Sequence, residues 1–390
     1  MDDTNTNTNT NTNISIGAIT IDNAIFKSEG YRFDEGMLAQ LKQFKESPIR
    51  VIQTDIVHNE AIKHIAIELQ TSKTLIVKAL RSANKHLKIS EKDISSAEGL
   101  LSTNGTDKEV ALSRLGSFYD EVGVELIDSS EYVDWSELMD KYFNTEAPFE
   151  TGKDKKHEFP DAIALLSIES WAEENNINIV AVSQDKGWKD FAAKSEHIIV
   201  VTSLSVALER FQPEKMVSHI ISFIQEDSLV AGGEAFLEAI EQGILNSIEG
   251  YDIYIEADSY LYFEVEDSFS EYIDHELDLD SDGKIKVKVI RIDDASITVK
   301  VGALVDVDVE ANFNFSVRDS VDKDYVGLGW ATCRTYETYP TDVLITLSGC
   351  FEKDFDSLEV INVEVLGELS KADFGSIEPD WGEEEEEDGE

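Results

Sequence analysis

The segment FPDAIALLSIESWAEENNINIVAVS (Phe159–Ser183) joins two patterns that together favour a parallel α/β sheet. Its first part, Phe159–Asn176, predicts a helix, and Pro160 suits the first turn because that turn leaves its amide hydrogens unpaired. Its second part, Ile177–Ser183, is apolar enough for a strand that is buried on both faces. A helix followed by a buried strand is the repeating unit of a parallel sheet covered by helices.

The rest of residues 1–212 shows the same alternation of short apolar runs and longer helical patterns. The other predicted strands are Ile16–Asp22, Ile49–Gln53, Gly123–Asp128 and His197–Thr202, and the other predicted helices are Asp34–Phe44 and Val57–His86. This order predicts a central parallel sheet with helices on both faces, formed by residues 15–212.

The pattern changes after Pro213. Residues 213–250 are mostly helical in pattern and are expected to form a linker segment. Residues 251–370 alternate apolar and polar side chains, as in KIKVKVIRI (Lys284–Ile292), which predicts a mostly antiparallel, β-sandwich-like domain. The Asn-Thr repeat in residues 1–14 predicts a disordered tail, and residues 371–390 are expected to form an acidic tail.

The charge of the chain is unevenly distributed. Its 390 residues include 80 acidic and 33 basic side chains, a net charge of −47. Residues 1–212 hold 35 acidic and 22 basic side chains (−13), so the remaining 45 and 11 give residues 213–390 a net charge of −34. Such a surface argues against binding nucleic acid through a broad basic face, but it leaves room for a local metal site built from carboxylates.

Several classes of protein are excluded by simple features of the sequence. Two cysteines, Cys333 and Cys350, cannot form a disulfide scaffold, which favours a reducing compartment. No apolar run approaches the roughly 18 residues that span a bilayer, and the first residues do not resemble a secretory signal. We therefore expect a cytoplasmic protein without a membrane partner.

Four carboxylates stand at positions where an open α/β sheet binds ligands, outside the carboxyl ends of its strands. These four acids, at the end of a predicted strand or the start of a predicted helix, are Asp22, Glu60, Asp161 and Asp185. Oxygen-only ligation suits Mg²⁺ or Mn²⁺, and such ions assist hydrolysis of a phosphodiester. Helix capping is the alternative explanation for Asp161, and turn chemistry is the alternative for Asp185.

Four segments resemble the PIN-domain family, over roughly residues 16–211. They are ITIDNAIF (Ile19–Phe26), DIVHNEAIKHI (Asp55–Ile65), KKHEFPDAIALLSIESWA (Lys155–Ala172) and IVAVSQDKGWKDF (Ile179–Phe191). The likeness is closest to bacterial PIN domains with a KHEFPDA-like stretch, and it implies a three-layer fold and a metal-dependent endoribonuclease. By motif position it assigns the four acids as catalytic ligands of Mg²⁺ or Mn²⁺, and Ser183 as the small hydroxyl residue before the last acid.

The sequence departs from the family pattern at two places. The family's Asp-Thr-Asn after the first strand reads Asp22-Asn23-Ala24, so Asn23 is a candidate supporting residue that is out of register. Many members of the family carry a further acid two residues after the last acid, but Gly187 occupies that position here. Asp190 is the nearest candidate to stand in for the missing acid.

Basic residues close to the third acid are candidates for contact with the phosphates of a substrate. They are Lys153, Lys155 and Lys156, for which an exposed loop is the alternative explanation. Trp188 could stack on a base or belong to the core. The expected substrate is RNA, single-stranded rather than paired, although carboxylates and a metal do not by themselves distinguish RNA from DNA.

Residues 213–390 contain no recognisable catalytic pattern. Three explanations for these residues remain. They could form an interaction or regulatory module that binds a protein partner, a homo-oligomerisation module, or an acidic shield that repels nucleic acid. The architecture is similar to larger bacterial PIN proteins, which suggests a toxin-like or anti-phage defence role. The alternative to a nuclease is a non-catalytic, acidic PIN-like binding or regulatory protein.

Overall fold

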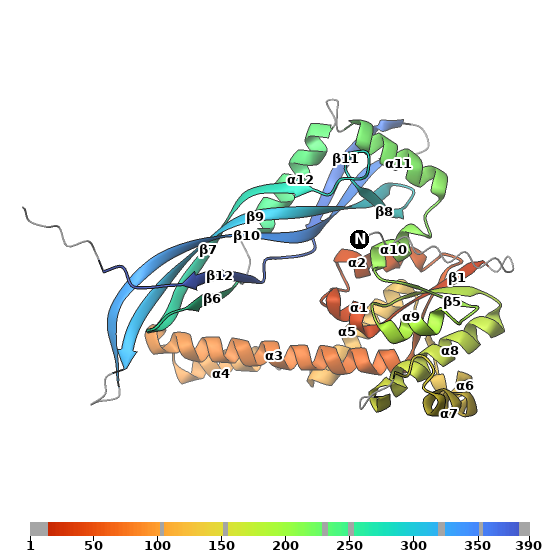
Figure 1. Ribbon diagram of the computed structural model, residues 1–390, viewed down its shortest axis with the longest axis horizontal. Coiled ribbons are helices and arrows are strands. Elements are labelled where there is room, and N and C mark those ends of the chain that lie inside the picture. Colours follow the sequence, from red (N-terminus) through yellow and green to blue (C-terminus); the bar gives the residue numbers. More distant parts are fainter. Residues whose placement is uncertain are drawn as a thin grey trace, which may run out of the picture. The chain divides into compact units, whose positions relative to one another are not determined.

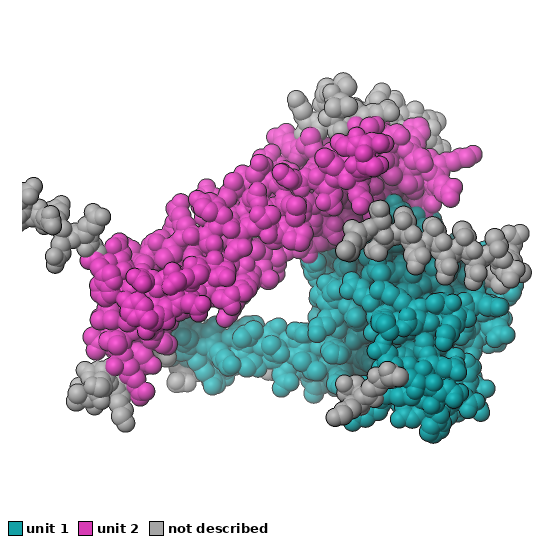
Figure 2. Space-filling view, in the orientation of Figure 1, with its two compact units in different colours: residues 1–211 teal, residues 212–390 magenta. Residues whose placement is uncertain are grey.

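The computed structural model describes residues 15–101, 105–150, 155–227, 233–248, 253–318, 324–350 and 354–381 (Figure 1). The chain forms two compact units, Met1–Phe211 (unit 1) and Gln212–Glu390 (unit 2), shown in different colours in Figure 2. The expected tail at residues 1–14 and the last part of the expected acidic tail, residues 382–390, lie outside the described residues, as does Lys153. Among the helices of the described residues, none combines the length and apolar character needed to cross a membrane.

Unit 1 is built on a five-stranded parallel sheet, which confirms the α/β fold predicted from the alternating patterns. Its strands are β1 (Ile16–Ile21), β2 (Arg50–Thr54), β3 (Glu125–Ile127), β4 (Asn178–Val182) and β5 (Ile198–Val201). The spatial order is β3-β2-β1-β4-β5, so the chain builds outward from β1 in one direction and then returns to place β4 on its other side. The carboxyl ends of β1 and β4 therefore flank a topological switch point, where open α/β sheets bind ligands.

Helices connect these strands. They are α1 (Asn23–Ser28), α2 (Gly36–Ala39), the 3₁₀ helix η1 (Gln40–Phe44), α3 (Asp55–Leu87), α4 (Glu91–Leu100), α5 (Asp107–Val122), α6 (Ser129–Tyr132), α7 (Trp135–Asn144), the 3₁₀ helix η2 (Lys155–Glu158), α8 (Phe159–Asn175), α9 (Lys186–Ala192) and α10 (Leu204–Glu209). Helix α8 buries Leu165, Ile168 and Trp171 in one core with strand residues such as Ile179. This packing fixes α8, and with it Asp161 in its first turn, relative to the sheet.

Unit 2 contains a long antiparallel sheet, which confirms the prediction from alternating side chains. Its strands are β7 (Tyr262–Leu277), β8 (Val287–Ile292), β9 (Ser296–Arg318), β10 (Tyr325–Cys350) and β11 (Asp354–Val365). The central strand β9 buries every second residue from Val299 to Phe315. Alternation of this length fixes the register, because a slip by one residue would turn the apolar face to water.

The segment at residues 213–250, expected to be a linker, contributes to the core of unit 2. It forms α11 (Glu214–Asp227) and α12 (Gly233–Ile248). Fully buried Ile240 and Ile244 of α12 belong to the same apolar cluster as Val299 and Val305 of β9. Their four-residue spacing places both isoleucines on one helix face, and that face is buried in the core shared with the sheet.

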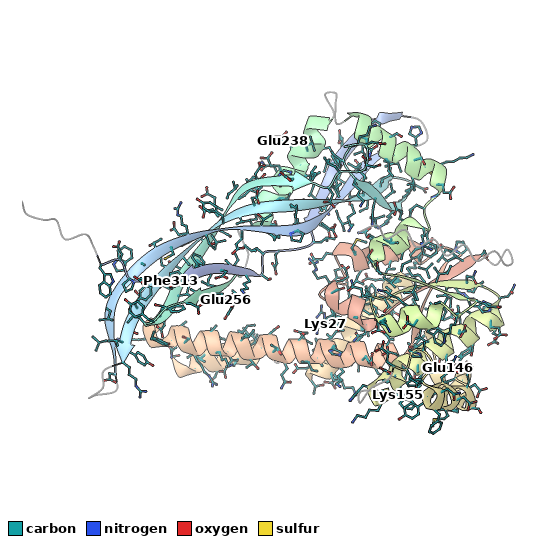
Figure 3. All side chains as sticks on the ribbon, in the orientation of Figure 1. Lys27, Glu146, Lys155, Glu238, Glu256 and Phe313 are labelled. Atoms are coloured by element: carbon teal, nitrogen blue, oxygen red, sulfur yellow. The ribbon has the colours of Figure 1, made fainter. Side chains whose placement is uncertain are left out.

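The tail expected from residue 371 begins with a strand instead. β12 (Lys371–Ser376) pairs in parallel with β6 (Tyr254–Asp258) in a separate two-stranded sheet. Alternate residues Ala372 and Phe374 of β12 point inward, and Phe374 contacts Phe313 of β9, which Figure 3 labels. The strand was not predicted because its short KADFGS sequence carries only two inward apolar positions.

Candidate active site

The switch point between β1 and β4 brings the first and last of the four acids together. Ile21 and Val182 are register partners, and the amide of Asp22 donates to the carbonyl of Val182 at 3.0 Å. The hydroxyl of Ser183 donates to Oδ2 of Asp22 at 2.7 Å and accepts from the amide of Asp185 at 3.0 Å. One buried hydroxyl thus orients both acids.

Asp22 is held in a buried position at the start of α1. It caps this helix by accepting from the amide of Ala24 at 3.3 Å, and the residue is only 7% exposed. Burial raises the pKa of its carboxyl, and the negative charge of Asp185 adds to this effect, whereas the Ser183 hydrogen bond opposes it.

Asp161 lies in the first turn of α8, where Trp188 of α9 fixes its direction. The indole Nε1 of Trp188 donates to Oδ1 of Asp161 at 3.0 Å, and the Trp188 side chain is fully buried. Burial raises the pKa of Asp161 to about 6, and the charges of Asp22, Asp185 and Glu158 contribute further. Trp188 therefore belongs to the core, and its polar edge still reaches the acid.

Asp185 caps α9 by accepting from the amide of Trp188 at 3.2 Å, while its side chain remains exposed. The next residue but one is Gly187, where the sequence resemblance would place a further acid. A Cβ at this position would lie 3.0 Å from Oδ1 of Asp185 and 3.1 Å from the carbonyl oxygen of Pro148. A side chain at this position would therefore require a small shift of Asp185 or of the backbone at Pro148.

Glu60 reaches the same region from the second turn of α3, a helix capped by Thr54. The side chain is half-buried, and burial raises its pKa to about 7, with further contributions from the negative charges of Asp161 and Asp22. Lys63, one turn along α3, opposes the shift. The four acids come from four separate segments and act on one another electrostatically.

The four acids form a set of oxygen donors with little compensating positive charge. Among the described residues, no three His, Cys, Asp or Glu side chains already surround one point as ligands of a single ion. Mg²⁺ and Mn²⁺ require fewer protein ligands, because Mg²⁺ usually keeps several waters and takes one or two carboxylates. Carboxyl groups that repel one another and offer only oxygen atoms therefore fit such an ion, which would offset their mutual repulsion.

The side chains of two candidate supporting residues contact residues other than the four acids. Asn23 is buried, and its Oδ1 accepts from the hydroxyl of Tyr31 at 3.3 Å, which is a structural contact between α1 and the loop that follows it. Asp190 accepts from Nζ of Lys186 at 2.9 Å on the exposed side of α9, and Lys186 also donates to Glu150. The contacts of Asp190 give no support for a role in place of the missing fifth acid.

The three lysines that are candidates for contact with substrate phosphates differ in their contacts and exposure. Lys155 is labelled in Figure 3. Its Nζ donates to Oγ1 of Thr145 at 2.7 Å and lies 4.7 Å from the ring centre of Tyr142, so local contacts hold this side chain. Lys156 is exposed on η2. Lys153 lies outside the described residues, and its expected role stays a prediction.

Gln53 is a supporting residue that the sequence patterns did not single out. It is 2% exposed at the end of β2, its Nε2 donates to the carbonyl of Ile21 at 2.7 Å, and its Oε1 accepts from the amide of Thr54 at 3.1 Å. These bonds tie the end of β1, directly before Asp22, to the start of α3. The signal was present as one amide side chain inside the apolar run RVIQT (Arg50–Thr54).

Comparison with known proteins agrees with this geometry. Residues 19–188 match the family model described as a PIN domain. No curated protein and no solved structure matches the chain. The match includes the four acids, Ser183 and Trp188, and it covers no part of unit 2.

Proposed function

Because residues 19–188 form a PIN domain, and PIN domains are generally nucleases, we propose that this protein is a metal-dependent endoribonuclease. The observation that supports the proposal best is the set of four acids at the switch point, three of which have raised pKa values. Keeping mutually repelling carboxyls in a half-buried site opposes folding, and a divalent cation offsets that cost. The experiment that tests the proposal is cleavage of single-stranded RNA by the parent and by Asp161→Asn, argued in the Discussion.

In this proposal the four acids hold Mg²⁺ or Mn²⁺, and their neighbours keep them in position. The bound ion supplies activation of water and neutralises charge that develops on the phosphodiester. Ser183 orients Asp22 and the backbone of Asp185, while Trp188 directs one oxygen of Asp161. Fixed partners of this kind reduce the reorganisation needed when substrate binds.

A divalent cation is expected to stabilise the folded protein. Millimolar Mn²⁺ should raise the melting temperature by several degrees, since a ligand at 100 times its Kd adds about 2.7 kcal/mol to the free energy of unfolding. The shift should disappear in Asp161→Asn and persist in Asp190→Asn, which removes an equal charge from the exposed side of α9. An equal Mn²⁺ shift in all three proteins would place cation binding elsewhere.

The raised pKa of Glu60 predicts a pH-dependent penalty in the metal-free protein. A carboxyl that holds its proton more tightly when folded contributes stability that is present below its unfolded pKa of 4.5 and lost as pH rises through about 7. In EDTA, Glu60→Gln should therefore be more stable than the parent at about pH 8, by on the order of 1 kcal/mol after allowance for solvent screening, and equal to it at about pH 4.

Urea denaturation at the two pH values measures this difference. Glu173→Gln, at an exposed position of α8, is the matched control and should show no gain at the higher pH. If Glu60→Gln is less stable than the parent at about pH 8, then Glu60 is held by favourable contacts, and its place in a repulsive cluster is wrong.

A non-catalytic binding protein is the second candidate function. It is supported by the lack of a ready three-ligand group among the described residues and by the structural contact of Asn23. This alternative predicts neither Mn²⁺-dependent stabilisation nor RNA cleavage, so the same two measurements separate it from the nuclease.

A further inference from the structure

Helix α3 continues far beyond the part that packs in unit 1. Its 33 residues extend over about 50 Å at 1.5 Å per residue. Buried side chains such as Val57, Ala61 and Ile65 belong to its first turns, whereas most later side chains are exposed, including Leu75 at 59%. Figure 1 shows the second half of α3 as a projecting arm with α4 beside it. We call residues Gln70–Leu100 the arm.

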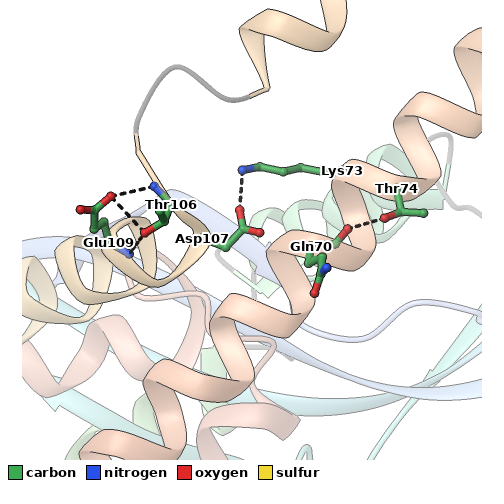
Figure 4. Close-up of polar contacts among 6 residues, drawn as sticks. All are labelled: Gln70, Lys73, Thr74, Thr106, Asp107 and Glu109. Carbon is green, nitrogen blue, oxygen red and sulfur yellow. Dashed lines mark hydrogen bonds and ion pairs between the residues drawn. The ribbon is translucent and has the colours of Figure 1, made fainter.

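In the arm, two ion pairs join α3 to neighbouring helices. Lys73 of α3 pairs with Asp107 in the first turn of α5, a helix whose start is closed by the reciprocal bonds of Thr106 and Glu109 (Figure 4). Further out, Arg81 pairs with Glu98 of α4 at 3.0 Å. The first pair joins the base of the arm to α5, and the second joins α3 to α4 further out.

The charge of the arm is opposite to that of the protein. The 21 residues from Gln70 to Ser90 contain five Lys and Arg and no Asp or Glu, in a chain where 80 of 390 residues are acidic. Among the described residues, Lys78 has no ion-pair partner, and Arg81 is 67% exposed despite its pair with Glu98. An exposed pair of this kind contributes little to stability, so Arg81 remains available to another anion.

Three basic side chains, Lys63, Lys78 and Arg81, follow the face of α3 that carries Glu60, whereas Lys73 lies on the side that faces α5. Lys78 comes 18 residues after Glu60, about five turns at 3.6 residues per turn, so both lie on one face about 27 Å apart. Viewed down the helix axis, Lys63 and Arg81 lie within about 60° of the line that joins Glu60 and Lys78. Between Lys63 and Lys78, the side chains within about 60° of this line are Ile67, His64, Thr71, Thr74 and Leu75, and the one carboxylate of the stretch, Glu68, lies about 80° away from it.

From this alignment we infer that the arm binds the phosphate backbone of single-stranded RNA and guides the strand toward the four acids. The inference rests on the proposed nuclease function and names how its substrate is held. Lys63, Lys78 and Arg81 form a basic stripe whose one end is the candidate catalytic Glu60. A strand of RNA needs such a local path, because phosphates are attracted by Lys and Arg and repelled by the acidic surface elsewhere.

An acidic polypeptide, including unit 2 with its net charge of −34, would also complement a basic helix. The helical register favours RNA over an acidic polypeptide as the partner of the arm. A path for substrate must lead to the reacting bond, and the stripe leads to Glu60 on its own helix. An acidic polypeptide has no such requirement, and it is therefore an outcome that the experiment has to reveal.

The test compares Lys78→Gln/Arg81→Gln with the control Lys45→Gln/Lys194→Gln, which removes two exposed positive charges away from the arm. Both pairs are made in the full chain carrying Asp161→Asn, so that binding is measured without cleavage. Fluorescence anisotropy with a 20-nucleotide single-stranded RNA at several salt concentrations is the readout. The arm variant should raise Kd about tenfold or more at 0.1 M salt and reduce the salt-dependence slope by about 1.4, or about 0.7 per lost phosphate contact.

A second readout uses the chain with Asp161 restored. The arm variant should lower kcat/KM on the 20-nucleotide RNA and leave a trinucleotide unaffected, because a trinucleotide is too short to extend about 27 Å from Glu60 to Lys78. Thermal melting monitors the fold of every variant.

Three outcomes decide the matter. Equal Kd values for the arm variant and the control would overturn the inference. Tighter RNA binding by the arm variant would also overturn it, because the arm would then be occupied by an acidic segment that competes with RNA. If the chain with Asp161 cleaves no RNA while the arm variant still weakens binding, the proposed nuclease fails and the RNA-binding arm stands.

Discussion

Replacement of Asp161 by Asn is expected to reduce RNA cleavage in Mn²⁺ on the order of 10²–10³-fold, the usual loss when one group that stabilises developing charge is removed. The substitution keeps the shape of the side chain and leaves an oxygen to accept from Nε1 of Trp188. It removes the negative charge that helps to hold a cation and that also raises the pKa of Glu60. The measurement is kcat on a single-stranded RNA under saturating Mn²⁺, with EDTA as the metal-free reference.

The control for this experiment is Asp190→Asn. Asp190 is an equally charged residue close by in sequence to Asp185, but it pairs with Lys186 on the exposed side of α9. The Asp190→Asn variant should cleave RNA at a rate within about twofold of the parent, because it loses only an exposed i,i+4 ion pair, which contributes little to stability. Cleavage by Asp161→Asn at the parent rate, with an unchanged melting temperature, would remove Asp161 from the site.

The fold of unit 1 was predictable because its strands are short, apolar and separated by strong helix patterns. The run Ile177–Ser183 predicted β4 (Asn178–Val182) to within one residue at each end, and Ile49–Gln53 predicted β2 (Arg50–Thr54) as closely. Buried parallel strands leave this signal in the sequence because both faces need apolar side chains. The spatial order of the strands needed the structure, since an apolar run does not specify its neighbour.

The four acids of the candidate site were named from the sequence, whereas the contacts that support them were not. The four acids follow from position, since strand ends and helix starts meet at one edge of the sheet. The hydrogen bonds that orient them join residues distant in sequence, as Ser183 does with Asp22 and Trp188 with Asp161. No local pattern encodes such pairs, which explains why Gln53 was overlooked and the indole edge of Trp188 was not foreseen.

Unit 2 shows where local patterns were insufficient. The alternation along β9 is strong enough to predict a strand, but it does not tell what covers the apolar face. The amphipathic helices α11 and α12 looked like a linker because they precede the β-rich region and carry no strand signal. Their apolar faces become meaningful only when the sheet that they cover is known.

Ile240→Ala is expected to destabilise unit 2 by about 2–5 kcal/mol, the usual cost of removing a buried isoleucine side chain and leaving a cavity. Ile240 is fully buried in the cluster that includes Val299 and Val305 of β9. Hydrogen exchange measured by mass spectrometry resolves the effect by segment. Amides of β9 that exchange through global opening of unit 2 should lose protection by roughly 30- to 4000-fold, whereas those of β1 and β4 should not change.

The control is Gln242→Ala on the exposed side of the same helix, which alters α12 without touching the core. It should leave the protection of β9 within about threefold of the parent, since surface substitutions usually change stability by less than about 0.5 kcal/mol. A linker helix would give the opposite pattern: Ile240→Ala would loosen α12 alone, and β9 would keep its protection. Loss of protection in β9 after a change in α12 therefore distinguishes a helix that covers the sheet from one that only joins two domains.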